Sequence, residues 1–219
     1  FFESFVTHPK ARKVNSALLR DFVRAMTVKG ELTSWTVALL GGGSGAAHTF
    51  PGGLTIDAMT IPSALAIESW VGPFDGIQDF ELGTGALEVK ATLSQAGFPA
   101  RIGSLEQLDD SARQPLFVAG ARLRQTESGQ NLPDFVEAMR LAISGEGESE
   151  RLLAERLLAA GYFDSHADRY PRRFAVAETR VVEVVADFPR LTSGSVPAGI
   201  MRAMYEIDLD KAPGDNIGV

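Results

Sequence analysis

The sequence predicts an α/β (α+β) domain in which helices flank a mixed β-sheet. Apolar residues at helical spacing occur on both sides of a hairpin pattern at 76–90, and residues 115–125 begin with an apolar run typical of a central strand. No internal repeat of fixed period occurs, which argues against solenoids and propellers. The 219 residues, 45% of them hydrophobic, can bury the core of one sizeable domain.

The first predicted helix covers residues 17–40, where apolar residues recur at helical spacing. Glu31 lies beside this apolar stripe, so its side chain is either half-buried with a partner or at the rim of a cleft. Residues 41–53 follow with six glycines and one proline. We expect a flexible insertion there, with a mobile flap over a site as the alternative. The stripe consists of Val28, Leu32, Trp35 and Leu39.

The remaining elements follow from periodicity and from capping signals. Asn131 is suited to cap the helix that follows it, and Gly161 lies just past the next helix, where a C-terminal glycine is favoured. A helix or a turn is expected around 104–110. In chain order the other predicted elements are a helix at 63–70, the hairpin at 76–90, a strand at 115–125, helices at 132–143 and 149–163, and closing strands at 173–188 and 201–209.

The residue inventory excludes several kinds of site. The chain has no cysteine, so disulfides, cysteine-ligated zinc, iron–sulfur clusters and thiol nucleophiles are excluded. His8, His48 and His166 are far apart in sequence, which gives a serine–histidine triad or an all-histidine metal site little support. Metals with oxygen ligands are still allowed.

Charge and hydropathy restrict the partners. The formal net charge of −7 argues against a broad, non-specific nucleic-acid binder, although a local basic strip is compatible with it. The sequence contains no apolar run of roughly 18 residues and no signal-peptide pattern. We therefore expect no membrane partner and a cytoplasmic location.

The hairpin at 76–90, GIQDFELGTGALEVK, carries an unusual set of charged residues. Because side chains alternate along a strand, Glu88 and Lys90 face one side while their neighbours face the other. A two-residue turn at Thr84-Gly85 would pair Glu81 with Glu88 and Asp79 with Lys90 on that same side. A three-residue turn without a bulge would split the cluster between the two faces.

This cluster fits metal-assisted chemistry on a phosphate. Two close carboxylates repel each other unless a cation or a proton lies between them. Mg²⁺ relieves that repulsion with one or two carboxylates plus waters, and it activates water for attack on a phosphate. Lys90 can orient or deprotonate that water and stabilise the charge that develops. The alternative is a solvated hairpin face with a salt bridge between Asp79 and Lys90.

The hairpin also resembles a known family. The GEL of the first helix, the QDF and LEVK of the hairpin and a following strand are similar to the core of the PD-(D/E)XK nuclease superfamily, the restriction-endonuclease-like fold. The phrases RIGSLEQLDD, LPDFVEAM and ERLLAAGYFDSHADRYPRRFAV extend the resemblance to bacterial proteins called PD-(D/E)XK motif proteins. The similarity runs from Met26 to Leu209. It implies one domain over 1–219, with the insertion at 41–53 and a flexible tail at 211–219.

The resemblance implies roles for individual residues. Asp79, Glu88, the backbone carbonyl of Val89 and Glu31 would hold Mg²⁺, with Mn²⁺ as a substitute. Lys90 would be the catalytic lysine, and Asp79, Glu88 and Glu31 would complete the catalytic set. One departure is Gln78, which stands where the motif has proline.

The resemblance also implies an activity and partners. Such a protein would be a Mg²⁺-dependent endonuclease that hydrolyses DNA in restriction or phage defence, with methyltransferase or ATPase components as partners. Cutting both strands would favour a homodimer. Two alternatives stay open: a non-catalytic DNA- or protein-binding subunit of a defence complex, and a nuclease acting on RNA or another phosphoester.

Two further groups are candidates for substrate binding. Arg101, Ser104 and Gln107 can line a phosphate-binding edge, although a loop and a helix start explain them nearly as well. Arg172 and Arg173 belong to the most basic strip, for which a DNA backbone is the natural partner and a solvated surface the alternative.

Overall fold

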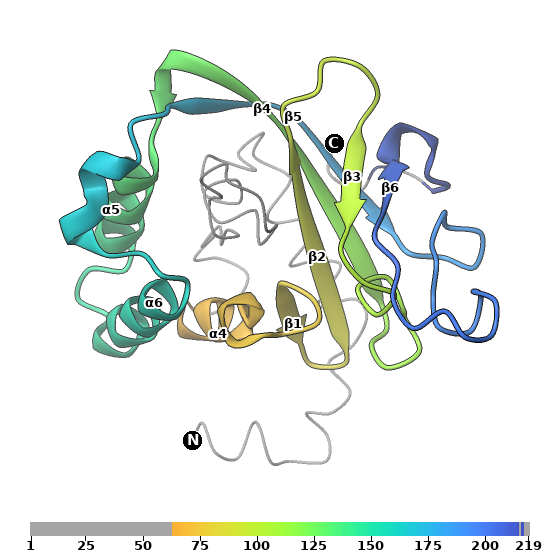
Figure 1. The fold of residues 1–219 in the computed structure, drawn as a ribbon. Coiled ribbons are helices and arrows are strands. Elements are labelled where there is room, and N and C mark those ends of the chain that lie inside the picture. The colour runs from red at the N-terminus through yellow and green to blue at the C-terminus, as the bar shows by residue number, and fades with distance from the viewer. Residues whose placement is uncertain (1–62, 215, 217–219) are drawn as a thin grey trace.

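The computed structural model describes residues 63–214 and residue 216 (Figure 1). The predicted helix at 17–40, Glu31 within it and the glycine-rich segment at 41–53 lie outside these residues.

A mixed four-stranded sheet organises the fold. Its strands are β1 (Phe80–Leu82), β2 (Gly85–Thr92), β4 (Leu116–Gln130) and β5 (Phe174–Glu183), in the order β1-β2-β4-β5. Strand β2 runs antiparallel to β1 and parallel to β4, and β4 runs antiparallel to β5. The mixed sheet with its flanking helices confirms the predicted fold class, which is consistent with a restriction-endonuclease-like fold.

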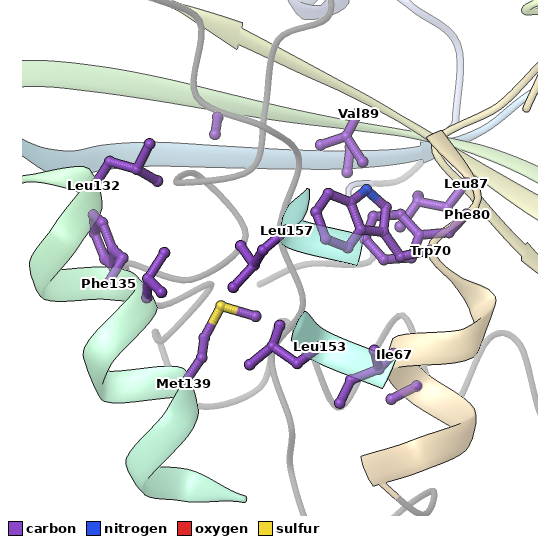
Figure 2. Close-up of a cluster of buried hydrophobic side chains, with 14 of the residues drawn as sticks. Ile67, Trp70, Phe80, Leu87, Val89, Leu132, Phe135, Met139, Leu153 and Leu157 are labelled. Carbon is purple, nitrogen blue, oxygen red and sulfur yellow. The ribbon is translucent and has the colours of Figure 1, made fainter. Parts of the chain in front are cut away.

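Three helices cover one face of this sheet: α4 (Ser63–Ser69), α5 (Leu132–Ala142) and α6 (Gly147–Ala159). Figure 2 shows Met139 of α5 and Leu153 and Leu157 of α6 in one buried cluster with the sheet residues Leu87 and Val89. All these side chains are buried. Leu87 and Val89 both face the helix layer because side chains at alternate positions of a strand point to the same side. The predicted helices at 63–70 and 132–143 are confirmed to within one residue at each end. The helix predicted at 149–163 is confirmed as α6, which begins two residues earlier and ends four residues earlier than predicted.

The predicted cap of α5 is also confirmed. The side chain of Asn131 accepts a hydrogen bond from the backbone N–H of Asp134 at 2.9 Å, and the Asp134 carboxylate accepts one from the Asn131 N–H at 3.4 Å. This reciprocal pair satisfies two backbone donors that the first turn leaves free. Gly161, which follows α6, has φ = 78°, the left-handed conformation expected after a helix.

A second, two-stranded sheet covers the opposite face. It pairs β3 (Pro99–Ile102) with β6 (Tyr205–Asp208) in antiparallel register. The second core lies between the two sheets and contains Ala86, Val118, Phe98 and Leu209 among its buried residues. Strand β6 was predicted from its sequence, whereas β3 was not, and residues 104–110 form turns rather than a helix. Short 3₁₀ helices occur at Gly72–Phe74, Asp164–Arg169 and Leu209–Lys211.

The helices of the described segment are all too short or too polar to cross a membrane.

Gly120 lets the two sheets approach closely. An added Cβ at this position would lie 2.6 Å from Leu209 Cδ1 and 2.6 Å from Phe98 Cε1, both in buried side chains. We expect Gly120→Ala to lower the free energy of unfolding by about 1–3 kcal/mol, because the packed core cannot make room without strain. Urea denaturation would measure it. Gly147→Ala is the control, since its Cβ meets nothing within 4 Å, and a stability loss as large as that of Gly120→Ala would contradict the packing argument.

Candidate metal centre

The hairpin turns one residue earlier than predicted. Phe80 pairs with Leu87, Glu81 with Ala86 and Leu82 with Gly85, so the two-residue turn is Gly83-Thr84 and the predicted turn at Thr84-Gly85 is wrong. Gly83 has φ = 61°, which a glycine at the first turn position adopts without strain. The pairing therefore shifts by two residues.

A shift of two residues leaves the faces unchanged, because side chains alternate with a period of two. Extended by one residue, the observed register puts position 79 opposite position 88. The predicted pairing of Glu81 with Glu88 does not occur. Glu81 instead forms an ion pair with Arg113, which also donates to the carbonyl oxygen of Gly83 at 3.2 Å.

Asp79 is fixed from both its backbone and its side chain. Its carbonyl oxygen accepts hydrogen bonds from the N–H groups of Val71 at 2.9 Å and Gly72 at 3.1 Å. Its Oδ2 accepts one from the N–H of Val89 at 2.9 Å, which ties the carboxylate to β2. Burial raises the pKa of Asp79, and the charge of Lys90 and the Val89 N–H oppose this rise. The hydrogen bond from the Val89 N–H thus holds the Asp79 carboxylate beside Glu88 and engages Oδ2 but not Oδ1.

Glu88 is almost completely enclosed. The residue is 1% exposed, and its side chain points toward the face that the second sheet covers. The alternative of a solvated hairpin face is therefore wrong for Glu88. Its Oε1 forms an ion pair with Lys90 Nζ, while its buried Oε2 has no hydrogen-bond partner among the described residues. Burial, and secondly the charge of Asp79, raise the pKa of Glu88 to about 8 against the pull of Lys90. Such a carboxylate requires a proton or a cation.

Lys90 lies at the edge of this enclosed space. Its side chain is 15% exposed, and its partner is Glu88 rather than Asp79 as the salt-bridge alternative had it. Nζ also lies 3.4 Å from Oε1 of Gln107, which belongs to the turns after β3. Two carboxylates and one ammonium therefore converge where the hairpin meets the second sheet.

A family model described as "Putative PD-(D/E)XK family member, (DUF4420)" matches residues 54–210. The chain belongs to this family. PD-(D/E)XK proteins are typically nucleases and generally use divalent metals such as Mg²⁺, so the broad class of the protein is nuclease-like. No curated protein and no solved structure matches the chain.

The PD-(D/E)XK pattern falls on the residues just described. Asp79 precedes β1, and Glu88, Val89 and Lys90 are consecutive in β2. Val89 contributes its amide to Asp79, and its side chain lies in the helix-side core. In the described part of the chain, no group of three or more His, Asp or Glu side chains is arranged to hold a metal. At this centre the described residues supply two carboxylates, Asp79 and Glu88, a number that suffices for Mg²⁺ with waters and phosphate.

Of the predicted substrate-binding residues, Gln107 alone is seen to contact this PD-(D/E)XK centre. Arg101 lies on Met204, with Nε 3.2 Å from Sδ, and Ser104 Oγ accepts a hydrogen bond from the Glu106 N–H at 3.3 Å. The contacts of Arg101 and Ser104 therefore fit the alternative given for them above, in which they serve the local loop structure and not a phosphate-binding edge.

Arg172 and Arg173 lie at the far end of the sheet. Arg173 forms an ion pair with Asp134 at 2.9 Å and donates to the carbonyl oxygen of Gly129 at 2.9 Å. Gly129 follows Gly120, the β4 partner of Lys90, by nine residues, which is about 30 Å along a strand. Arg172 lies over the ring of Phe174, 5.5 Å from its centroid. The structure does not bring these two arginines to the centre.

Gln78 is the residue whose contribution the sequence did not reveal. It is 3% exposed, and its Nε2 donates to the carbonyl oxygens of Glu106 and Gln107, both at 3.3 Å. A glutamine in place of the motif's proline was the available signal. Its partners lie almost thirty residues away, so periodicity could not identify them.

Proposed function

We propose that the protein is a Mg²⁺-dependent endonuclease that hydrolyses DNA phosphodiester bonds. The carrying observation is the buried Oε2 of Glu88, which has no hydrogen-bond partner in the described part of the chain and lies on a carboxylate next to Asp79. A buried carboxylate oxygen without a partner costs free energy unless a cation takes it. The residue types fit Mg²⁺, which prefers oxygen ligands and needs only one or two carboxylates.

Asp79 and Glu88 would hold the ion between them. Asp79 is oriented for this by the Val89 N–H on Oδ2, and Glu88 by its enclosure under the second sheet. Bound Mg²⁺ supplies Lewis-acid activation of water and neutralises phosphate charge. Lys90, partly open to solvent, is suited to hold or transfer a proton and to stabilise negative charge on the phosphate.

DNA is proposed as the substrate because the resemblance to the PD-(D/E)XK motif proteins implies a role in restriction or phage defence. This assignment implies a cytoplasmic enzyme that acts with methyltransferase or ATPase components, and a homodimer if both strands are cut. A non-catalytic subunit is the second candidate. It is favoured by the net charge of −7, which repels DNA, and by the ion pair that engages Arg173 with Asp134 instead of with a DNA phosphate.

The test is cleavage of plasmid and phage DNA by the purified protein with Mg²⁺, Mn²⁺ or EDTA, with an RNA of similar length in parallel. We expect cleavage of DNA with either metal, none with EDTA, and none for Asp79→Ala. Cleavage that persists in Asp79→Ala would show a contaminant or another site. No cleavage with either metal, even with candidate defence proteins added, would favour the non-catalytic subunit.

Gly72 offers a milder perturbation of the same centre. A Cβ added there would lie 3.1 Å from Asp79 Oδ1, so the carboxylate must shift by a few tenths of an ångström. We expect Gly72→Ala to weaken Mg²⁺ binding about tenfold, since metal ligands tolerate little displacement. Isothermal titration calorimetry would measure it, and the melting temperature of the metal-free protein serves as the folding control. Unchanged Mg²⁺ affinity in a folded variant would argue against Oδ1 as a ligand.

A further inference from the structure

We propose that Gln107 is a positioning residue for Lys90, and that buried Gln78 holds the loop that carries it. This inference rests on the proposed function, since it assigns Gln107 to the lysine of that site. It replaces the expectation that Gln107 contacts the phosphate directly. This loop comprises residues 103–109 and forms the first part of the connection between β3 and β4.

The contacts identify which end of the Gln107 amide faces Lys90. Its Oε1 lies 2.7 Å from the backbone nitrogen of Gly103 and 3.4 Å from Lys90 Nζ. A backbone N–H and an ammonium group can only donate, so the atom that both approach must be the oxygen. Gln107 therefore acts on Lys90 as a hydrogen-bond acceptor, and its orientation is fixed by Gly103.

Gln78 fixes the position of this loop relative to the hairpin. Its side chain is buried, and Nε2 donates to the carbonyl oxygens of Glu106 and Gln107. Because Gln78 directly precedes Asp79, the acidic ligand and the lysine's acceptor are attached to the same short segment. Proline in this place would have no side-chain donor for those carbonyls.

A neutral acceptor is useful once the carboxylates bind a cation. In the metal-free arrangement Lys90 Nζ pairs with Glu88 Oε1. If Glu88 turned its charge toward Mg²⁺, Gln107 would be the hydrogen-bond partner that Lys90 keeps among the described residues. The amide oxygen orients Nζ without adding a third negative charge near the scissile phosphate.

Two substitutions of similar size distinguish an acceptor from a donor. Gln107→Glu keeps an acceptor oxygen for Gly103 and Lys90, whereas Gln107→Met keeps only the packing. We expect Gln107→Met to lower kcat for plasmid cleavage about 10–100-fold with Mg²⁺ affinity unchanged, and Gln107→Glu to recover at least half of the lost activity on a logarithmic scale. Gln95→Met, at an exposed glutamine, is the control and should match the native protein.

The opposite order would overturn the proposal. If Gln107→Glu cleaves no faster than Gln107→Met, an acceptor oxygen at this position does not restore the action of Lys90, and the positioning role is refuted. Native kcat in Gln107→Met would also overturn it. Gln78→Leu should reproduce the defect of Gln107→Met, because the loop loses its two hydrogen bonds, and native activity in this folded variant would remove Gln78 from the proposal.

A readout without catalysis separates this proposal from the proposed function. The ammonium protons of a hydrogen-bonded lysine exchange slowly enough for NMR at low temperature and mildly acidic pH. We expect the Lys90 resonance, assigned with Lys90→Met, to be present with Mg²⁺ in the native protein and in Gln107→Glu and lost in Gln107→Met. An equal Lys90 resonance in all three would refute the positioning role. A native protein that shows this pattern but cuts no DNA would refute only the nuclease assignment.

Discussion

The metal-free Glu88→Gln variant is expected to be more stable than the native protein at pH 8, by on the order of 4 kcal/mol. The reason is the pKa of Glu88, which burial raises from 4.5 to about 8, so that ionising this side chain inside the folded protein is costly. Glutamine resembles the protonated acid in shape and cannot ionise. The variant should also lose all stabilisation by Mg²⁺, which for the native protein is about 2.7 kcal/mol at a hundredfold excess over Kd.

The direction of the pH dependence follows from linkage. A folded-state pKa above the unfolded value means that the folded state binds the proton more tightly. The stabilisation is fully present below pH 4.5 and is lost as the pH rises toward 8, so native stability in EDTA should fall across this window. The raised pKa of Asp79 acts in the same direction in both proteins.

Urea denaturation in EDTA at several pH values between 5 and 9 would measure the difference. The control is Glu206→Gln, which changes an exposed glutamate of β6 and should follow the native curve. If Glu88→Gln and the native protein had parallel stability curves, the buried, high-pKa state of Glu88 would be refuted.

Lys90→Met is expected to lower the rate of DNA cleavage by about 10²–10⁴-fold, the range that removal of a proton-handling group typically costs. Binding of Mg²⁺ should stay at native strength or become tighter, because the substitution removes a positive charge beside the ligands. The variant thus separates metal binding from chemistry, which Asp79→Ala cannot do.

Initial rates on plasmid DNA and calorimetric Mg²⁺ titration would provide both measurements. Lys211→Met is the matched control, since the Lys211 side chain is 82% exposed and its ion pair with Asp208 spans 3.7 Å. A Lys90→Met rate within about threefold of native, a difference of less than 1 kcal/mol, would exclude Lys90 from the chemistry.

Local patterns in the sequence predicted much of the fold. Helix α5 and its cap follow from periodicity and from Asn131, and β2 follows from alternation, because these features depend on neighbours in the chain. The turn was misplaced because both Gly83 and Gly85 satisfy the demand for glycine, and the strand register decides between them. That error did not separate Asp79 from Glu88.

The surroundings of the site could not be predicted in the same way. The face of β2 that carries Ala86 and Glu88 packs against a second sheet that pairs β3 with β6, and these strands are about a hundred residues apart in sequence. The contact of Gln107 with Lys90 and the pairing of Arg173 with Asp134 are also tertiary. The family resemblance indicated which residues to examine, whereas their burial and partners required the coordinates.

The pairing of β3 with β6 has a consequence for the order in which the centre forms during synthesis. Phe98 donates its N–H to Asp208 Oδ1 at 2.8 Å, and its carbonyl oxygen accepts a hydrogen bond from the Leu209 N–H at 2.9 Å. The backbone of Phe98 is therefore held by residues more than a hundred positions later in the chain. A ribosome delivers Asp79, Glu88 and Lys90 well before β6 emerges. The second core, which packs on the face of β2 that carries Ala86 and Glu88, therefore lacks Ile207 and Leu209 until the closing strand has been synthesised.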